Sequence, residues 1–124
     1  CFRYVDAVRR IGVAGLICLL LTTLVGCKSI PQDASVKDFC SKGESFSAST
    51  TFETGKKRAK TLAKVGTPKG IDKDARKGFE ELIDRVSGSK DGADFKKKAK
   101  KLSAAERKHL EALSDYIART CDLS

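Results

Sequence analysis

Apolar side chains recur at helical spacing through most of the chain after residue 35. The clearest case is the segment 71–86, IDKDARKGFEELIDRV. One face of a helix there would carry Ala75, Phe79, Leu82, Ile83 and Val86. The alternation of apolar and polar residues that is typical of strands is nowhere sustained, and β-branched residues are not concentrated. We therefore predict an all-α domain, a small bundle of four or five short helices.

Helix-end signals divide this region. Ser35 is a candidate N-cap for a first helix that contains Val36, Phe39 and Cys40. A second helix over 56–65 is expected to stop at Gly66, since glycine favours helix ends and Pro68 follows closely.

The segment 87–92, SGSKDG, is a predicted loop. Beyond it, Phe95, Ala99 and Leu102 indicate a short fourth helix. Ser103 and Glu106 then match a capping box, in which each side chain bonds a backbone N–H of the other. The last helix has an apolar stripe of Leu110, Leu113, Ile117 and Cys121.

The N-terminal part of the chain has a different character. Residues 11–25 carry no charge and follow Arg9 and Arg10. As a helix this stretch would be about 22 Å long, short of the roughly 30 Å of a bilayer's hydrocarbon core. A basic segment before a short apolar one is typical of a cleaved secretory signal.

The apolar stretch ends in Leu24, Val25, Gly26 and Cys27. This run resembles the lipobox of bacterial lipoproteins, in which the signal is removed just before an obligatory cysteine. A thiolate is needed there to accept diacylglycerol as a thioether, and a small residue before it gives the peptidase access. The resemblance implies that Cys27 becomes the acylated first residue of the mature protein. An ordinary secretory signal with an incidental cysteine is the alternative.

The chain has five cysteines, and the lipobox reading accounts for three of them. Cys1 and Cys18 leave with the signal, and Cys27 carries the lipid. Outside the cytoplasm the two others, Cys40 and Cys121, are expected to form a disulfide that joins the first and last helices. A metal-binding or catalytic role is less favoured, because the sequence has one histidine and no C-x-x-C spacing.

Three parts of the chain follow from these assignments. We expect a signal peptide at 1–26 that is removed, a lipidated tether at 27–35 and a helical domain at 36–124. The tether is polar and aperiodic and contains Pro31. At about 3.5 Å per residue it would keep the domain within about 28 Å of Cys27.

Four short stretches carry a wider resemblance: FC at Phe39 and Cys40, VGTP at 65–68, GFEEL at 78–82 and YIARTC at 116–121. With the lipobox, they resemble a group of small actinobacterial lipoproteins that has no assigned activity. The resemblance implies a helical fold and a disulfide, and it brings no catalytic residue.

The sequence predicts no catalytic or metal site and no cofactor. His109 is the single histidine, and spacing alone identifies no nucleophile or carboxylate partner for it. Glu80 with Glu81, and Asp72 with Asp74, do not face each other on a helix, so we interpret them as solvated charges. Phosphate-binding loops and hydrolase nucleophile motifs are absent from the sequence. We therefore expect a protein that is not an enzyme.

Basic residues provide the one lead on function. Without Arg3, Arg9, Arg10 and Asp6, which precede Cys27, the net charge is about +7. The lysines cluster on the polar sides of two predicted helices. They are Lys56, Lys57, Lys60 and Lys64, and Lys96, Lys97, Lys98, Lys100 and Lys101. Anionic lipid headgroups or phosphate-bearing wall polymers would fit such faces. A solvated face that only keeps the domain soluble is the simpler interpretation.

We expect a lipid-anchored protein on the extracytoplasmic face of the cell membrane, with a structural or interaction role. The alternative is a small-ligand carrier or transporter-accessory lipoprotein, which would need an apolar pocket in a small core. Nucleic acid is not an expected partner, since the chain has no Trp and only two Tyr for base stacking. The sequence identifies no protein partner.

Overall fold

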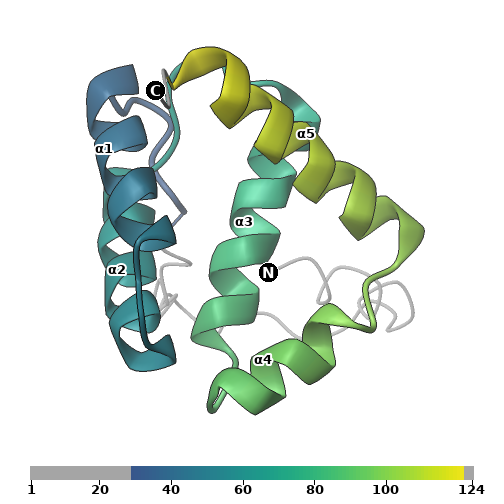
Figure 1. Cartoon of the computed structure of the whole chain (residues 1–124). Helices are drawn as coiled ribbons and strands as arrows, with labels where there is room; N and C mark the ends of the chain where they lie inside the picture. Colours follow the sequence, from purple (N-terminus) through teal and green to yellow (C-terminus); the bar gives the residue numbers. More distant parts are fainter. Residues whose placement is uncertain (1–28, 122–124) are drawn as a thin grey trace, which may run out of the picture.

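The computed structural model describes residues 29–121, which form five helices (Figure 1). These are α1 (Val36–Ser47), α2 (Phe52–Val65), α3 (Lys73–Ser87), α4 (Gly92–Ala99) and α5 (Ala104–Thr120). Within the described residues the β-type pairing is limited to a single bridge between Ala34 and Pro68. The prediction of an all-α bundle is confirmed. The predicted signal peptide and Cys27 lie outside the described residues.

Local capping explains most of the helix boundaries. The Ser35 hydroxyl accepts the Asp38 N–H at 3.0 Å at the start of α1, and Ser103 and Glu106 form the predicted capping box of α5. Gly66 ends α2 with a φ of 83°, which a residue with a side chain rarely adopts. These three predicted ends are confirmed.

Two boundaries differ from the sequence prediction. Helix α2 begins four residues earlier than the segment 56–65, because Thr51 caps it by accepting the Thr54 N–H at 3.2 Å. Helix α4 stops at Ala99, so Leu102 lies in the connection to α5. Both differences are at helix ends. A single turn there has too few apolar residues for periodicity to locate the boundary.

The five helices pack as two pairs and a short connecting helix. Helices α1 and α2 form an antiparallel hairpin, α3 crosses α5, and α2 contacts α3 to join the pairs. Helix α4 closes the end of the bundle at which α3 finishes (Figure 1). None of the residues in α4 is buried.

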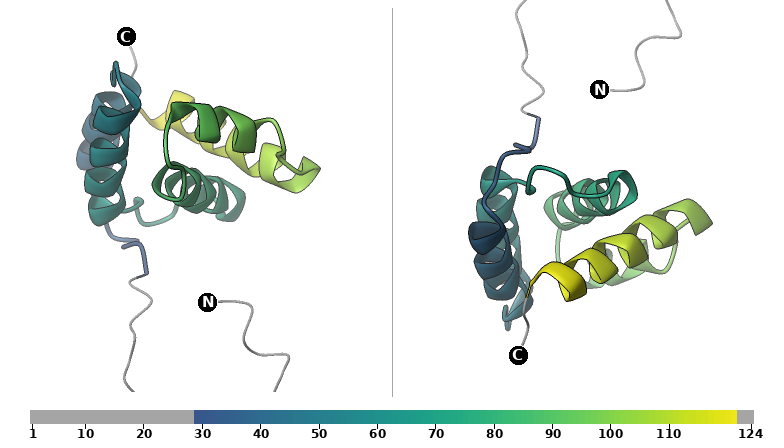
Figure 2. Two further views of the ribbon diagram at one scale, coloured as in Figure 1. Left: turned by 90° about the horizontal axis from the view of Figure 1, so that it is seen from below. Right: turned by 90° about the horizontal axis from the view of Figure 1, so that it is seen from above.

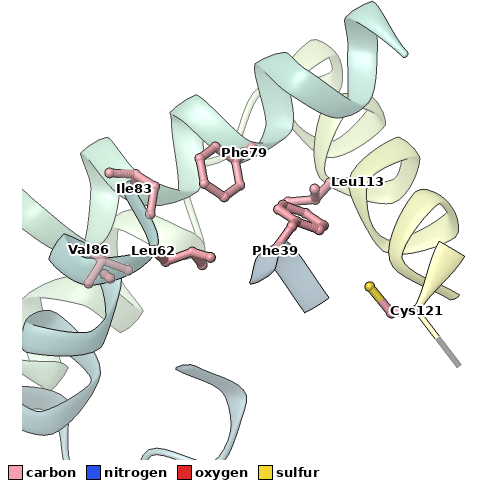
Figure 3. Close-up of a cluster of buried hydrophobic side chains, with 8 residues drawn as sticks. Phe39, Leu62, Phe79, Ile83, Val86, Leu113 and Cys121 are labelled. Carbon is pink, nitrogen blue, oxygen red and sulfur yellow. The ribbon is translucent and has the colours of Figure 1, made fainter. Parts of the chain in front are cut away.

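The core lies where the two pairs meet. Its buried residues are Phe39, Ala59, Leu62, Phe79, Ile83, Val86, Leu113 and Cys121. Phe39 extends from α1 toward α3 and α5, and its ring centroid lies 5.8 Å from that of Phe79 (Figure 3). One aromatic side chain of the first helix thus holds the hairpin against the α3–α5 pair.

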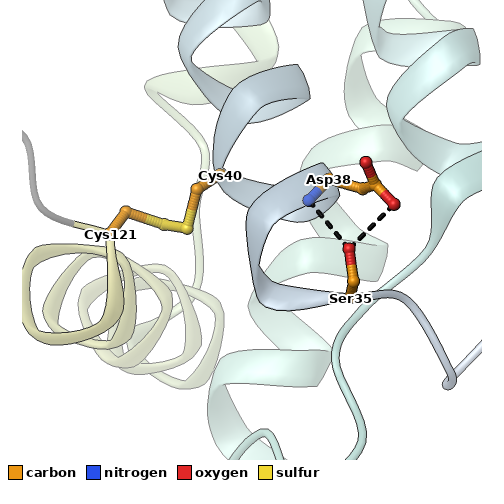
Figure 4. Close-up of a disulfide and its surroundings, with 4 residues drawn as sticks. All are labelled: Ser35, Asp38, Cys40 and Cys121. Atoms are coloured by element: carbon orange, nitrogen blue, oxygen red, sulfur yellow. Dashed lines mark hydrogen bonds between the residues drawn. A yellow bond between two sulfur atoms is a disulfide. The ribbon is translucent and has the colours of Figure 1, made fainter.

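The predicted disulfide is present. Cys40 in α1 is bonded to Cys121, the residue that follows α5, with 5.4 Å between their Cα atoms (Figure 4). It links the two ends of the domain across 81 positions of sequence. The first and last helices are therefore joined covalently as well as by packing.

The end of the predicted tether is not free. The Pro31 carbonyl accepts the Thr67 N–H at 3.0 Å, and the Ala34 N–H donates to the Thr67 carbonyl at 3.2 Å. The Arg76 guanidinium donates to the Ile30 carbonyl at 2.9 Å. A Cβ at Gly66 would overlap the Pro31 carbonyl. The segment Ile30–Ala34 is thus part of the folded domain, which corrects the expectation of a tether extending to residue 35.

The docked segment and α4 lie on opposite sides of the molecule. In both views of Figure 2 residues 29–35, which precede α1, lie on one side, α3 lies in the middle, and α4 is on the far side. Along α3 the separation between Arg76 and Gly88 is about 18 Å at 1.5 Å per residue. We call the side with Ile30, Pro31 and Lys64 the linker side.

Candidate functional site

The predicted basic residues are mostly at the surface. Eight of the nine are exposed, and Lys56 is half-buried. Its ammonium donates to the Ser89 carbonyl at 2.7 Å, in the loop between α3 and α4. Lys56 therefore has a structural contact that joins α2 to this loop, while the other eight are exposed to solvent.

One group of lysines surrounds α4. It consists of Lys90, Lys96, Lys97, Lys98, Lys100 and Lys101, all exposed, and we call it the α4 basic surface. The Lys98 side chain is held within the fold, because its ammonium donates to the Gly88 carbonyl at 2.6 Å and lies 2.9 Å from the Asp94 carboxylate. Among the described residues, the other five side chains take part in no ion pair.

The carboxylates nearest this surface are engaged within the fold. Asp91 caps α4 by accepting the Asp94 N–H at 2.8 Å. Asp94 in turn accepts hydrogen bonds from the Lys98 side chain and the Lys90 N–H, which hold its pKa below the ordinary value of 3.8. The surface therefore keeps most of its positive charge uncompensated.

Glu106 is engaged in the same way at the start of α5. Its carboxylate accepts the Ser103 N–H at 2.7 Å and pairs with Arg85 at 2.9 Å. The hydrogen bonds from Ser103, followed by the charge and hydrogen bond of Arg85, lower its pKa from the ordinary value of 4.5. This carboxylate is bound by Arg85 of α3 and by Ser103, the N-cap of α5, and it forms no ion pair with the lysines of α4.

The α2 lysines are divided between the two sides of the molecule. Lys56 reaches the loop that follows α3, whereas Lys64 lies beside Ser29, Ile30 and Pro31 on the linker side. Lys60 is one turn before Lys64 on the same helix. The sequence clusters at 56–64 and 96–101 therefore do not form one continuous patch.

An interaction that the sequence analysis missed lies between α3 and α5. His109 Nδ1 lies 2.8 Å from Glu81 Oε1, and Glu81 Oε2 is buried without a hydrogen-bond partner among the described residues. The interpretation of Glu81 as a solvated charge was wrong. Glu80 is half exposed and pairs with Arg76 at 3.0 Å, as a surface carboxylate would. Glu81 and His109 are 28 positions apart in the sequence, and their contact depends on how α3 crosses α5.

A polar cleft of about 450 Å³ runs beside this pair. It is lined by Glu81, Asp84, Arg85, Lys98, Lys101 and Glu106. Three carboxylates and three cations line it, and two of these residues, Arg85 and Glu106, are paired with each other. The arrangement links α3, α4 and α5, and it offers no single charge sign to a ligand.

A smaller apolar cavity of about 190 Å³ lies between α1 and the α3–α5 pair. Its walls include Phe46, Leu82 and Ile117, and the disulfide borders it. Ligand sites in proteins usually measure about 300–1,000 Å³. This cavity can hold only a small apolar group.

Residues 29–121 contain neither a candidate metal site nor a candidate membrane-spanning helix. That part of the chain contains no cluster of three or more His, Cys, Asp or Glu side chains able to hold a metal ion. It also contains no helix with the length and apolar character needed to cross a membrane. The predicted lipidation site at Cys27 and the cleavage residues Leu24, Val25 and Gly26 lie outside the described residues.

Comparison with known proteins gave no match: no protein-family description, curated protein or solved structure is significantly similar to the chain.

Proposed function

We propose that this protein is a lipid-anchored protein of the extracytoplasmic face of the cell membrane, with a structural or interaction role rather than a catalytic one. Its anchor is a diacylglyceryl group on Cys27, and its basic surface contacts an anionic partner. The observation that carries the proposal is the docked segment Ile30–Ala34, which begins three residues after Cys27.

Docking shortens the reach of the anchor. Three extended residues span about 11 Å, compared with about 28 Å for the eight residues of a fully free tether. The linker side is therefore held against the membrane surface. Lys64, exposed beside Ser29 and Ile30, is placed near anionic headgroups, where a well-placed basic side chain contributes about 1 kcal/mol.

The disulfide supports an extracytoplasmic location. Structural disulfides form and persist in oxidising compartments and are rare in the cytoplasm. Cys40 and Cys121 lie close enough, at 5.4 Å between Cα atoms, to be joined with the helices packed as they are.

The contacts of His109 support a non-catalytic role. Its ring bridges to Glu81 across the α3–α5 crossing, where Gly78 packs directly against the His109 backbone. The pair therefore has a clear function in joining two helices, and the proposal needs no proton-transfer role for it.

Detergent partitioning tests the anchor. The full chain is produced in a bacterium that processes lipoproteins, and its membranes are extracted with a detergent that separates into two phases. We expect the parent in the detergent-rich phase and Cys27→Ser in the aqueous phase. A Cys40→Ser/Cys121→Ser variant is the control and should partition like the parent. Equal partitioning of the parent and Cys27→Ser would exclude the anchor.

The small-ligand alternative rests on the apolar cavity. At about 190 Å³ it is smaller than usual ligand sites, so we rank this role second. Titration of the protein with hexanoate, followed by NMR, tests it. A carrier role requires saturable shifts at Phe46, Leu82 and Ile117, and their absence would remove this candidate.

A further inference from the structure

The α4 basic surface has more positive charge than its surroundings neutralise. Lys96 and Lys97 lie in the last turn of α4, and Lys100 and Lys101 follow the helix directly, so four like charges lie close together. Asp94 and Glu106 are already bound within the fold, and Asp84 lies in the mixed-charge cleft that Lys98 and Lys101 also line. Lys96, Lys97 and Lys100 are not among the residues that line this cleft. The surface is thus complementary to an anion that the described part of the chain does not supply.

The position of this surface determines which anion it can meet. Helix α4 lies across α3 from the docked segment (Figure 2). Gly88, whose carbonyl accepts a hydrogen bond from Lys98, is about 18 Å from Arg76 along the axis of α3. The anchor reaches only about 11 Å from Ile30. While Ile30–Ala34 stays docked, the α4 surface cannot turn to the membrane that holds the anchor. It faces away from that membrane.

The side chains also indicate the kind of partner. Lysine is a flexible point charge and does not impose the planar, paired geometry of arginine. A row of exposed lysines therefore suits a flexible chain of repeating negative charges. The nearest aromatic side chain, Phe95, is half-buried against Phe52 with 6.0 Å between ring centroids, so it is not free to stack on bases.

From these observations we propose that the α4 basic surface is a docking site for a phosphodiester-linked polyanion on the side of the protein that faces away from its membrane. The orientation rests on the proposed anchor at Cys27, whereas the charge complementarity does not. The protein would thus hold the polymer at one end and the membrane at the other.

Binding to poly(glycerol phosphate) tests the proposal with the full chain. The test variant replaces Lys96, Lys97, Lys100 and Lys101 with Gln. The matched control replaces four exposed lysines on or near the linker side, Lys60, Lys64, Lys69 and Lys73, and changes the net charge equally. We expect the α4 variant to bind at least about 10-fold more weakly. Binding of this variant should also depend less on salt. The slope of log K against log salt should become shallower by about 3, since each of the four lost contacts contributes about 0.7.

The control variant should bind within about twofold of the parent, and a variant with Arg at the four α4 positions should retain binding, since both keep the charge of the surface. Equal losses in the α4 and control variants would mean that only net charge matters. Equal binding of polyglutamate and poly(glycerol phosphate) would refute the choice of phosphate. Either result would overturn the proposal.

A second measurement separates the polymer from the membrane. The unacylated Cys27→Ser protein and its variants are mixed with vesicles of phosphatidylglycerol and floated. We expect the α4 substitutions to weaken polymer binding more than vesicle binding. The opposite result would make this surface a lipid contact and contradict the proposal. Polymer binding does not require the lipid, so failure of the anchor and failure of the α4 surface give different results.

Discussion

Gly78 lies where α3 packs directly against the backbone of α5. It is buried, and a Cβ built on it would overlap the carbonyl oxygen of His109. We expect Gly78→Ala to destabilise the protein by about 2 kcal/mol, within the usual range for overpacking, because the two helices must separate. Chemical unfolding measures the change.

Gly43 provides the matched control. It also lies inside a helix, α1, but the space around its Cβ position is open. Gly43→Ala should stabilise the protein by about 0.5–1 kcal/mol through helix propensity. Similar changes at both glycines would mean that the crossing is looser than the structure shows.

Arg76 holds the segment before α1 in place. Its guanidinium donates to the Ile30 carbonyl at 2.9 Å and to the Thr67 hydroxyl. Arg76→Gln removes these donors, so the docked segment should open more often. Hydrogen exchange at the Ala34 and Thr67 amides should then speed up by about 10-fold or more, equivalent to about 1.4 kcal/mol. Lys77→Gln, at the exposed neighbouring position, should leave both amides unchanged, and equal exchange in all three proteins would contradict the docking.

At this scale the sequence predicts what local chemistry decides. Ser35, Gly66 and Ser103 mark helix ends through contacts within a few residues, and each prediction is confirmed. Glu81 and His109 are 28 positions apart, and their contact depends on how α3 crosses α5. No spacing rule connects them, which explains why the sequence analysis missed the pair.

Helix α5 begins with a capping box that contains a carboxylate, Glu106. The capping box and Arg85 lower the pKa of Glu106 below 4.5, so in acid the unfolded chain takes up a proton more readily than the folded protein does. Stability from this group is therefore complete above about pH 4.5 and is lost as pH falls through the lower folded-state value.

Thermal unfolding of Glu106→Gln at pH 7 and pH 3 checks this linkage. Gln still accepts the Ser103 N–H through its amide oxygen, so the helix should form. The melting temperature should decrease more between pH 7 and pH 3 for the parent than for Glu106→Gln. Glu111→Gln, a control at an exposed position of the same helix, should behave like the parent. The same loss in all three proteins would disprove the role of this carboxylate.

The existence of each helix follows from periodicity, but the position of α4 does not. Its segment was predicted from Phe95 and Ala99, yet none of its residues is buried. Asp91 caps the helix, the Lys98 ammonium donates to the Gly88 carbonyl, and the Phe95 ring packs against Phe52. Eight of the nine lysines in the two sequence clusters are exposed, and Lys56 is half-buried. Their division between two sides of the molecule required the arrangement of α2, α3 and α4.

The disulfide acts on the whole molecule, because it closes a loop of 81 positions. Restricting such a loop in the unfolded chain corresponds to about 4.5 kcal/mol in the chain-entropy account. Cys40→Ser and Cys121→Ser should each lower the melting temperature strongly, and the double variant should be little worse than either single one. Reducing agent should act on the parent and not on the variants. An unchanged melting temperature in both tests would contradict the bridge as a stabilising link.

The overall architecture was predictable only in part. Periodicity and two cysteines at the ends of the domain indicate a closed helical bundle, and that prediction is confirmed. The docking of Ile30–Ala34 was not predictable, because this polar segment is held by backbone hydrogen bonds to Thr67 and by Arg76. Such contacts leave no pattern in the sequence, and they give the molecule its two sides.

The central claim is that Cys27 carries the lipid that holds the linker side against the membrane. Mass spectrometry of the protein extracted from native membranes tests this claim most directly. We predict an N-terminal peptide that begins at Cys27 and carries a diacylglyceryl mass, and no such product from Cys27→Ser. Two results would contradict the claim. One is an unmodified Cys27 within a longer N-terminal peptide, and the other is a product of Cys27→Ser with the mass expected for the acylated parent.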